Sequence, residues 1–437
     1  MSIFTISGLR GIVGTDLPVA QLQQAGNAFG MLIRGGTCAV GRDTRNSADM
    51  TFDSVVSGLL YRGCRVLDLG VTSTPSVFRS VRSMNLDGGI SITSSHNPPE
   101  WHGAKFIVPP GRGILQNELN TLLQYDGGFE GRGIVTRVDS SYSSDMIEFL
   151  TANSCTDLKL AIDLGGGAGC VLVEHVLKEL GCRVTSLNSS PGIFSRVIDP
   201  TTSKLDSLSI EIKRSSYHAG FAFDADADRL VIMDSGGVRL SPDYTLLAGL
   251  KYLHHVETID KVAISVDTSL SVVKFLDDIG VKIINTGVGE VNVVSQIMKN
   301  NCDAGGEGSS GGFIYPSFNL CRDGLLVATM ISRMIKELGS LEAIFAGTKK
   351  YAQQRVSIPC ERSIYGGVME AISSTEPDAE TIDGVKICPS DESWVLIRPS
   401  NTESGIRISA EAKSKDDAIT LASTYEKKIR EILERDF

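Results

Sequence analysis

Residues 223–233 read Phe-Asp-Ala-Asp-Ala-Asp-Arg-Leu-Val-Ile-Met, so three aspartates alternate with alanines between two apolar stretches. In an extended segment every second side chain points the same way, and the three carboxylates converge on one face. Such charges repel one another unless a cation lies between them, and hard oxygen ligands favour Mg²⁺ or Ca²⁺. An EF-hand is excluded because Arg229 stands where that loop needs glycine. Since Mg²⁺ normally combines one or two carboxylates with substrate phosphate, Asp224, Asp226 and Asp228 predict a magnesium site with a phosphate partner.

Short apolar segments alternate with amphipathic stretches on both sides of this loop, as in α/β proteins. The pattern restarts near residues 159 and 261, which predicts three similar mixed-sheet α/β domains, and from about residue 353 it changes to a C-terminal α+β domain. The expected strands are 37–40, 64–69, 89–92, 159–163, 183–187, 220–223, 261–266, 282–285, 395–398 and 405–412, and the expected helices are 48–62, 171–180, 271–278 and one that begins at 415. The predicted domains are 1–140, 141–250, 251–350 and 351–437.

Composition excludes several classes of protein. The 437 residues carry a net charge of −10, which argues against a nucleic-acid-binding protein but leaves room for one small phosphate held by local arginines. No apolar run reaches the roughly 20 residues that span a bilayer, and the N-terminus has no signal-peptide pattern. The nine cysteines form no Cys-x-x-Cys pair, which predicts free thiols in a reducing cytoplasm. We therefore expect a cytoplasmic protein with no membrane or nucleic-acid partner.

A second polar loop, Ile92-Thr-Ser-Ser-His-Asn-Pro-Pro-Glu, follows an expected buried strand. A serine at a strand end, on a loop stiffened by two prolines, presents its hydroxyl at the edge of a sheet. His96 can donate to an anion or move protons, and Lys105 can neutralise a phosphate or act as acid or base. By itself the loop is explained equally well as a polar turn that uses Ser, Asn and Pro for their turn chemistry.

The stretch Gly305-Gly-Glu-Gly-Ser-Ser-Gly-Gly brings Glu307, Ser309 and Ser310 into a loop that can wrap a polar ligand closely. A glutamate and two serines suit the hydroxyls of a sugar. The Gly-x-Ser-x-Gly pattern also matches a hydrolase nucleophile elbow, but that fold needs a histidine after the serine, and all six histidines precede it. A flexible turn is the alternative.

The stretch Leu396-Ile-Arg-Pro-Ser-Asn-Thr-Glu-Ser-Gly-Ile-Arg places two guanidinium groups around a turn rich in hydroxyl and amide donors. Together these groups form an anion site for which phosphate is the natural ligand. The side chains assigned to it are Arg398, Ser400, Asn401, Thr402 and Arg407. The alternative is a hairpin turn with solvated arginines.

In combination these loops are specific, because a reactive serine, a metal cage, a sugar loop and a phosphate anchor occur once each, in that order. The chain resembles the α-D-phosphohexomutase superfamily over its whole length. The segments that carry the resemblance are Thr93-Ser-Ser-His-Asn-Pro, Asp224-x-Asp-x-Asp-Arg, Gly306-Glu, Arg398-Pro-Ser-Asn-Thr-Glu, Ser7-Gly-Leu-Arg-Gly and Gly41-Arg-Asp-Thr-Arg. The resemblance implies three similar α/β domains and a fourth α+β domain around a central cleft.

The resemblance also implies a mechanism. A phosphorylated Ser95 would transfer its phosphoryl group to a hexose monophosphate, and the bisphosphorylated sugar would reorient and return a phosphoryl group to the serine. Mg²⁺ would be held by Ser95, Asp224, Asp226 and Asp228, with hexose 1,6-bisphosphate as activator. The further catalytic candidates are Lys105, His96, Arg10 and Arg229. Ser94 stands where the family usually has a small apolar residue, and Ser95 is assigned the phosphoryl group because it directly precedes His96.

The stretch Glu100-Trp-His-Gly-Ala-Lys-Phe and the Gly-Glu-Gly start of the sugar loop are most similar to phosphoglucosamine mutases of the archaeal and Bacteroidetes-like type. The expected reaction is therefore glucosamine 6-phosphate to glucosamine 1-phosphate. Phosphomannomutase or phosphoglucomutase activity is the alternative within the family. From other classes, a non-catalytic sugar-phosphate-binding protein and a phosphatase are the alternatives. The expected partner is a small-molecule sugar phosphate, and the chain is expected to be a monomer or a homodimer.

Overall fold

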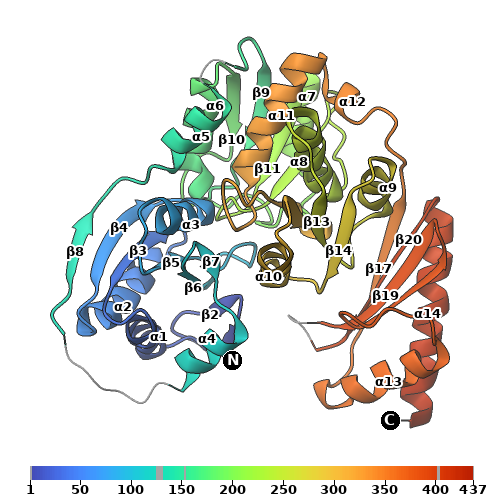
Figure 1. Ribbon diagram of the computed structural model, residues 1–437, viewed down its shortest axis with the longest axis horizontal. Coiled ribbons are helices and arrows are strands. Elements are labelled where there is room, and N and C mark those ends of the chain that lie inside the picture. The colour runs from blue at the N-terminus through green and yellow to red at the C-terminus, as the bar shows by residue number, and fades with distance from the viewer. Residues whose placement is uncertain (1, 125–130, 152–153, 401–403, 437) are drawn as a thin grey trace. The chain divides into compact units, whose positions relative to one another are not determined.

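The computed structural model describes residues 2–124, 131–151, 154–400 and 404–436 (Figure 1). The chain divides into two compact units. The first unit contains Met1–Thr258 and Ser310–Ala346, and the second contains Ile259–Ser309 and Gly347–Phe437.

The first unit begins with a mixed eight-stranded sheet in the order β1-β2-β6-β5-β3-β4-β8, with β7 paired to β6. Strands β5, β3, β4 and β8 run parallel, whereas β6 is antiparallel to both of its neighbours β2 and β5. The strands are β1 Ile3–Thr5, β2 Gly8–Ile12, β3 Thr37–Arg42, β4 Arg65–Val71, β5 Gly88–Ile92, β6 Trp101–Val108, β7 Arg112–Gly113 and β8 Ile134–Arg137. The helices are α1 Val19–Leu32, α2 Ala48–Tyr61, α3 Thr74–Ser83 and α4 Gln116–Leu123.

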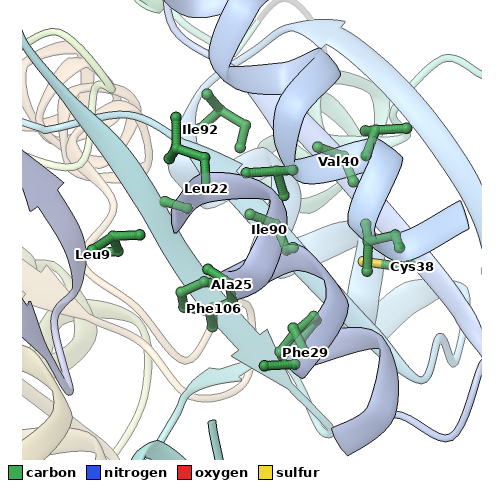
Figure 2. Close-up of a cluster of buried hydrophobic side chains, with 14 of the residues drawn as sticks. Leu9, Leu22, Ala25, Phe29, Cys38, Val40, Ile90, Ile92 and Phe106 are labelled. Atoms are coloured by element: carbon green, nitrogen blue, oxygen red, sulfur yellow. The ribbon is translucent and has the colours of Figure 1, made fainter. Parts of the chain in front are cut away.

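Helices cover both faces of this sheet, since its central strands are apolar on both sides. Figure 2 shows Leu22 and Phe29 of α1 beside Ile90 and Phe106 of the sheet, in a cluster to which α2 and α4 also contribute. On the opposite face α3 packs through Val77 and its apolar neighbours. Each large side chain buried in this way contributes about 1.5–3 kcal/mol, so packing holds the strands, and the loops that leave their carboxyl ends, from both sides.

The second sheet of the first unit has the order β10-β9-β11-β12, in which only β12 is antiparallel to its neighbour. Its strands are β9 Lys159–Asp163, β10 Arg183–Leu187, β11 Ala219–Phe223 and β12 Leu230–Met233. The helices around it are α5 Tyr142–Leu150, the 3₁₀ turn Ala168–Val171, α6 Val173–Glu179, α7 Asp206–Arg214 and α8 Asp243–Val256. Strand β16 Gly312–Ile314 and helices α11 Gly324–Leu338 and α12 Leu341–Ile344 complete the first unit.

The second unit contains a parallel sheet, β14-β13-β15, and an antiparallel sheet, β17-β20-β19-β18. The elements of the parallel part are β13 Lys261–Ser265, α9 Leu270–Asp278, β14 Lys282–Thr286, α10 Glu290–Asn300 and β15 Ala304–Glu307. The elements of the antiparallel part are β17 Ala352–Ile358, α13 Tyr365–Thr375, β18 Val385–Ser390, β19 Ser393–Pro399, β20 Ile406–Ala412 and α14 Lys415–Asp436. Helix α14 lies along the antiparallel sheet (Figure 1), and its apolar side closes a core with Ile397 and Ile408.

These mixed-sheet α/β domains and the C-terminal α+β domain confirm the predicted fold class. The domain boundaries at residues 140, 250 and 350 stay a prediction. Among the helices that the structure describes, none is both long enough and apolar enough to cross a membrane.

Candidate active site and metal centre

Ser95 lies in the loop that leaves the carboxyl end of β5. Its side chain is buried, and its backbone adopts a left-handed conformation with φ 50°. The hydroxyl donates to Asp224 Oδ2 at 3.0 Å and lies 3.4 Å from His96 Nδ1. The neighbouring Ser94 hydroxyl points instead to Asn97 Oδ1 at 3.4 Å. Of the two serines, Ser95 therefore faces the aspartates.

A buried ion pair holds this loop in place. Arg45 donates to the carbonyl oxygens of Ser95 at 2.6 Å and Asn97 at 2.8 Å, and also reaches those of Pro98 and Trp101. Its Nε donates to Asp43 Oδ2 at 3.0 Å. One planar guanidinium thus ties four carbonyls of the loop to one carboxylate.

Asp43 extends this brace to the start of the loop. It accepts from the Thr93 hydroxyl at 2.7 Å, and Thr93 Oγ1 in turn accepts from the Ser95 backbone N–H at 2.9 Å. Although burial opposes ionisation, His102, Arg45 and Thr93 together hold the pKa of Asp43 at about 2. The carboxylate is therefore ionised at neutral pH.

The three aspartates lie in the loop between β11 and β12, and all three are completely buried. One ligand atom from each lies within 4.8 Å of the other two. Oδ1 of Asp226 and Oδ1 of Asp228 are buried without a hydrogen-bond donor among the residues described. Burying a bare carboxylate oxygen is costly, so two such oxygens turned into one small site fit a bound cation. The residues present can therefore hold a metal ion, as predicted for Asp224, Asp226 and Asp228.

Fixed positive charges surround the aspartates. Lys105 Nζ lies 2.6 Å from Asp226 Oδ2 and 2.8 Å from Asp228 Oδ2, and Arg322 Nη2 lies 2.9 Å from the same Asp228 oxygen. Arg229 donates to Asp199 at 3.1 Å and is 4.0 Å from Asp224 and Asp228. Arg10 reaches Asn97 Oδ1 at 3.3 Å.

The charges in the site shift the pKa values of Asp224 and Asp228 in opposite directions. Burial and the charges of Asp226 and Asp228 raise the pKa of Asp224 well above its usual value. Burial also opposes ionisation of Asp228, but Arg322, Lys105 and Arg229 hold its pKa far below the usual range. Desolvation and the nearby arginines lower the pKa of His96, so its ring is neutral at neutral pH.

The predicted sugar loop is divided between the two units. In the second unit Glu307 is buried at the end of β15, and the Ser309 hydroxyl donates to Asp267 Oδ2 at 2.6 Å. In the first unit the Ser310 hydroxyl lies 3.3 Å from Arg322 Nη1. Ser310 thereby contacts the same arginine that donates to Asp228.

The predicted phosphate anchor lies in the antiparallel sheet of the second unit. Arg398 and Arg407 face each other on β19 and β20, and Arg398 Nη1 lies 4.0 Å from Asp383. The Ser400 backbone N–H donates to the Gly405 carbonyl at 2.9 Å. Asn401 and Thr402, also predicted to bind phosphate, lie outside the described residues.

Sequence reasoning missed several side chains around Ser95 and the aspartates. Arg322, Thr74 and Arg45 each contact a predicted site residue from a distant part of the chain, and Asp43 supports Ser95 through Thr93 and Arg45. Arg45 and Asp43 belong to the Gly41-Arg-Asp-Thr-Arg segment, which did carry a signal. Thr74 begins the helix that follows β4, and Arg322 lies between β16 and α11, so both stand in strand-to-helix connections, where α/β proteins often bind ligands.

Sequence models of one family match the chain in order. The phosphoglucomutase/phosphomannomutase α/β/α domains I, II and III match residues 1–125, 140–237 and 241–351, and the C-terminal domain matches residues 364–426. The chain belongs to the phosphoglucomutase/phosphomannomutase family. It is a phosphohexomutase, an enzyme that moves a phosphoryl group within a hexose phosphate.

Relatives and solved structures in this family resemble the chain over nearly its full length. A probable phosphoglucosamine mutase of Methanocella arvoryzae is 34% identical, with 99% of each chain covered. One of Pyrococcus abyssi is 32% identical, with 99% of this chain and 98% of the relative covered. A phosphoglucomutase/phosphomannomutase family protein from Burkholderia thailandensis has a TM-score of 0.86 at 21% identity, with 99% of each chain covered. A putative phosphomannomutase from Thermus thermophilus has a TM-score of 0.84 at 25% identity, with 98% of this chain and 100% of that chain covered.

Proposed function

We propose that this phosphohexomutase interconverts glucosamine 6-phosphate and glucosamine 1-phosphate through a phosphoserine at Ser95. The observation that carries the role of Ser95 is its buried hydroxyl, which lies 3.0 Å from Asp224 Oδ2 on a braced loop. The choice of glucosamine is supported by relatives named as probable phosphoglucosamine mutases, which are 32–34% identical over at least 98% of both chains.

The proposed transfer breaks the Oγ–P bond of phosphorylated Ser95 while a sugar hydroxyl oxygen bonds to the phosphorus. The sugar hydroxyl gives up its proton, and the departing Ser95 Oγ takes one up. In the return step the bond between the other phosphate and its sugar oxygen breaks, the sugar oxygen takes up a proton, and the phosphate bonds to Ser95 Oγ, which loses its own proton. The nearest acceptors for that proton are Asp224 Oδ2 at 3.0 Å and His96 Nδ1 at 3.4 Å. His96 can serve because its ring is neutral.

The cations of the site neutralise the moving phosphoryl group. Asp224, Asp226 and Asp228, together with phosphorylated Ser95, would hold Mg²⁺, which when bound supplies charge neutralisation at the transferring group. Lys105, Arg229 and Arg10 add fixed positive charge beside the same loop.

The remaining loops would hold the two ends of the substrate. We assign the sugar hydroxyls to Glu307, Ser309 and Ser310. We assign the phosphate that is not reacting to Arg398, Ser400, Asn401, Thr402 and Arg407. One anchor can serve both orientations of the sugar, because a phosphate presents similar oxygens in each. An unphosphorylated Ser95 has no group to transfer, so we propose hexose 1,6-bisphosphate as the activator that loads it.

Intact-mass spectrometry tests the nucleophile. After incubation with glucose 1,6-bisphosphate and Mg²⁺, the wild-type chain and Ser94→Ala are expected to gain one phosphate, and Ser95→Ala none. Ser94→Ala is the matched control because its hydroxyl points to Asn97 and not to the aspartates. Phosphate on Ser95→Ala would move the nucleophile to Ser94. A wild-type chain that never carries phosphate would refute the phosphoserine mechanism and favour a non-catalytic sugar-phosphate-binding protein.

The second candidate is phosphomannomutase or phosphoglucomutase activity, which the 25% identical structure named as a putative phosphomannomutase favours. Coupled assays with glucosamine, glucose and mannose 6-phosphates, primed with a bisphosphate, rank the substrates. We expect the highest kcat/KM with glucosamine 6-phosphate. Equal values for all three would contradict the glucosamine preference, and net release of inorganic phosphate would indicate a phosphatase.

A further inference from the structure

The loop between β11 and β12, which contains the three aspartates, is called the metal loop here. In Asp226 and Asp228 the two carboxylate oxygens have different surroundings. Oδ2 of Asp226 and Oδ2 of Asp228 accept hydrogen bonds from protein donors, whereas Oδ1 of each is buried and has no donor within the described part of the chain. A carboxylate can rotate about its Cα–Cβ and Cβ–Cγ bonds, so something must decide which oxygen turns toward the cation site.

For Asp226 the decisive contacts come from outside its own loop. Thr74, the first residue of α3, donates its hydroxyl to Asp226 Oδ2 at 2.6 Å and its backbone N–H to the Asp226 carbonyl at 3.0 Å. Side chain and backbone of one residue thus hold side chain and backbone of the other. Lys105 Nζ reaches the same Oδ2 at 2.6 Å, but its ammonium group is shared with Asp228 Oδ2 at 2.8 Å.

A second hydroxyl supports the Thr74 contact. Ser91 Oγ on β5 lies 2.8 Å from Thr74 Oγ1, and both residues are buried. Because the Thr74 hydroxyl has one proton and donates it to Asp226 Oδ2, Ser91 must be the donor between the two hydroxyls. The donors therefore run in one direction, from Ser91 to Thr74 to Asp226.

We propose that Thr74, oriented by Ser91, is a positioning residue that assigns Oδ2 of Asp226 to the protein and leaves Oδ1 for the cation. A β-branched side chain at a helix start has few rotamers, so its hydroxyl is held ready at little entropic cost. Partners that orient metal ligands in this way typically contribute a factor of 10–100 in metal affinity. This inference rests on the proposed metal role of the three aspartates.

Direct metal binding tests the inference without an activity assay. Free Mn²⁺ is followed by electron paramagnetic resonance during titration of the unphosphorylated full-length chain. Thr74→Val removes the hydroxyl at nearly constant volume, and we expect the Mn²⁺ Kd to rise about 10–100-fold. Thr74→Ser keeps the hydroxyl and is expected to stay within about threefold of wild type. Thr51→Val is the matched control, because Thr51 is buried in the same domain and its hydroxyl has no partner in the described structure.

Two further variants separate the possible failures. Asp226→Asn removes a proposed ligand, so unchanged Mn²⁺ binding in that variant would overturn the metal site itself. If Asp226→Asn loses Mn²⁺ while Thr74→Val binds as wild type does, the metal site stands and the positioning role is wrong. Equal weakening by Thr74→Val and Thr74→Ser would assign the effect to packing and also overturn the role. Should Thr74→Val fail to fold, Ser91→Ala decides: a Kd raised severalfold supports the donor chain, and an unchanged Kd refutes it.

Discussion

At the residue scale, the backbone of Ser95 needs an explanation, since a serine with φ 50° occupies a region that side chains usually avoid. Such a conformation costs of order 1–3 kcal/mol and persists only where the surroundings over-determine it. Arg45 supplies that determination, because it binds the carbonyl of Ser95 and three further carbonyls of the loop. The strained backbone and the buried ion pair are thus parts of one device that aims the Ser95 hydroxyl at Asp224.

Replacing Arg45 by lysine keeps the charge but loses the planar fork that reaches four carbonyls. We expect Arg45→Lys to lower kcat by about 100-fold, since a nucleophile misplaced by about 1 Å costs a factor of this size. The KM for the sugar phosphate should change little, because the proposed anchor lies in the second unit. Steady-state kinetics with a coupled assay measures both constants.

Arg42→Lys serves as the control for Arg45→Lys. Arg42 is the last residue of β3 and lies three positions before Arg45, but it pairs with Asp49 at 2.8 Å and Asp68 at 3.0 Å. The kcat of Arg42→Lys should remain near that of wild type. A kcat of Arg45→Lys equal to that of Arg42→Lys would contradict the aiming role.

How far the site could be predicted depends on how local its chemistry is. Ser95 and the three aspartates stand in short polar loops between apolar strands, so the sequence singles them out as candidates. For Ser95 alone a polar turn was an equal alternative, and the combination of loops decided between them. The roles of all four residues stay predictions. Thr74 and Arg322 contact the aspartates across more than 90 positions of sequence. Nothing in their immediate neighbours distinguishes them from an ordinary helix-start threonine or a surface arginine, and only the folded chain brings them to the carboxylates.

At the scale of elements, two other segments of the chain pack against the backbone of the metal loop. The glycine turn after β9 touches it, since the Ala168 N–H donates to the Ala225 carbonyl at 2.7 Å. On the other side Gly324 begins α11, and a Cβ added there would lie 2.7 Å from the Arg229 carbonyl. The position of Gly324 requires glycine, because a backbone carbonyl of the metal loop lies where a side chain would begin.

We expect Gly167→Ala to displace the metal loop. The added Cβ would lie 2.5 Å from the Ala225 carbonyl oxygen, far inside van der Waals contact. Overpacking of this kind costs about 1–3 kcal/mol, and the urea midpoint should fall accordingly. Gly366→Ala in α13 is the control: its Cβ meets nothing within 4 Å, and alanine should stabilise that helix by about 0.5–1 kcal/mol. If both variants unfold at the wild-type midpoint, the close approach at Gly167 is not a constraint.

The start of α11 carries a pH-dependent contact. Asp323 caps the helix by accepting from the Leu326 N–H at 3.0 Å, and it accepts from the Tyr142 hydroxyl at 2.6 Å. Complete burial raises its pKa to about 6, against 3.8 for an ordinary aspartate. A raised folded pKa means that the contribution to stability is fully present below about pH 4 and is lost as the pH rises through about 6. The shift corresponds to about 3 kcal/mol.

Asp323→Asn isolates this contribution, since asparagine keeps an acceptor for the same donors but does not titrate. The free energy of unfolding of the wild type, relative to that of Asp323→Asn, should fall by about 3 kcal/mol between pH 4 and pH 7.5. Urea unfolding at the two pH values measures it. Asp416→Asn, at an exposed position of α14, controls for the loss of a charge. A constant difference between wild type and Asp323→Asn would show that Asp323 does not titrate in this range.

Regular elements were predictable where apolar periodicity dominates. Predicted strands 159–163 and 183–187 coincide with β9 and β10, and the terminal helix begins at Lys415 as expected. The helix predicted at 171–180 is present as α6 Val173–Glu179, and a 3₁₀ turn over Ala168–Val171 precedes it. Strand β6 was not predicted as a strand, since Gly103 and Lys105 interrupt its apolar pattern.

At the scale of the whole molecule, the division into units could not be predicted from the sequence. The chain enters the second unit at Ile259, returns to the first at Ser310 and leaves it again after Ala346. Motif order and strand rhythm report which elements form, but they do not report which elements share a core. The proposed sugar loop falls on the crossing between Ser309 and Ser310, so a loop that is continuous in sequence belongs to two bodies.

Glu411 offers a way to perturb the second unit alone. Its buried carboxylate accepts from the Ser269 hydroxyl at 2.5 Å, the Leu270 N–H at 2.7 Å and the Trp394 indole N–H at 2.7 Å, and so joins β20 and β19 to the start of α9. Glu411→Gln replaces one carboxylate oxygen by an NH₂ group, which cannot accept a hydrogen bond from the donors that face it. We expect a loss of about 1–3 kcal/mol in the stability of the second unit.

The two tryptophans make this loss measurable, because Trp101 lies in the first unit and Trp394 in the second. In a Trp101→Phe background, the urea midpoint seen by Trp394 fluorescence should fall in Glu411→Gln. The Mn²⁺ Kd should not change, since the proposed ligands all lie in the first unit. Glu392→Gln is the control, because its pair with Lys413 lies at the surface, where solvent screens the interaction. If Glu411→Gln and Glu392→Gln have equal urea midpoints, the buried carboxylate does not stabilise the second unit. If Glu411→Gln also weakens Mn²⁺ binding, the stabilities of the two units are coupled.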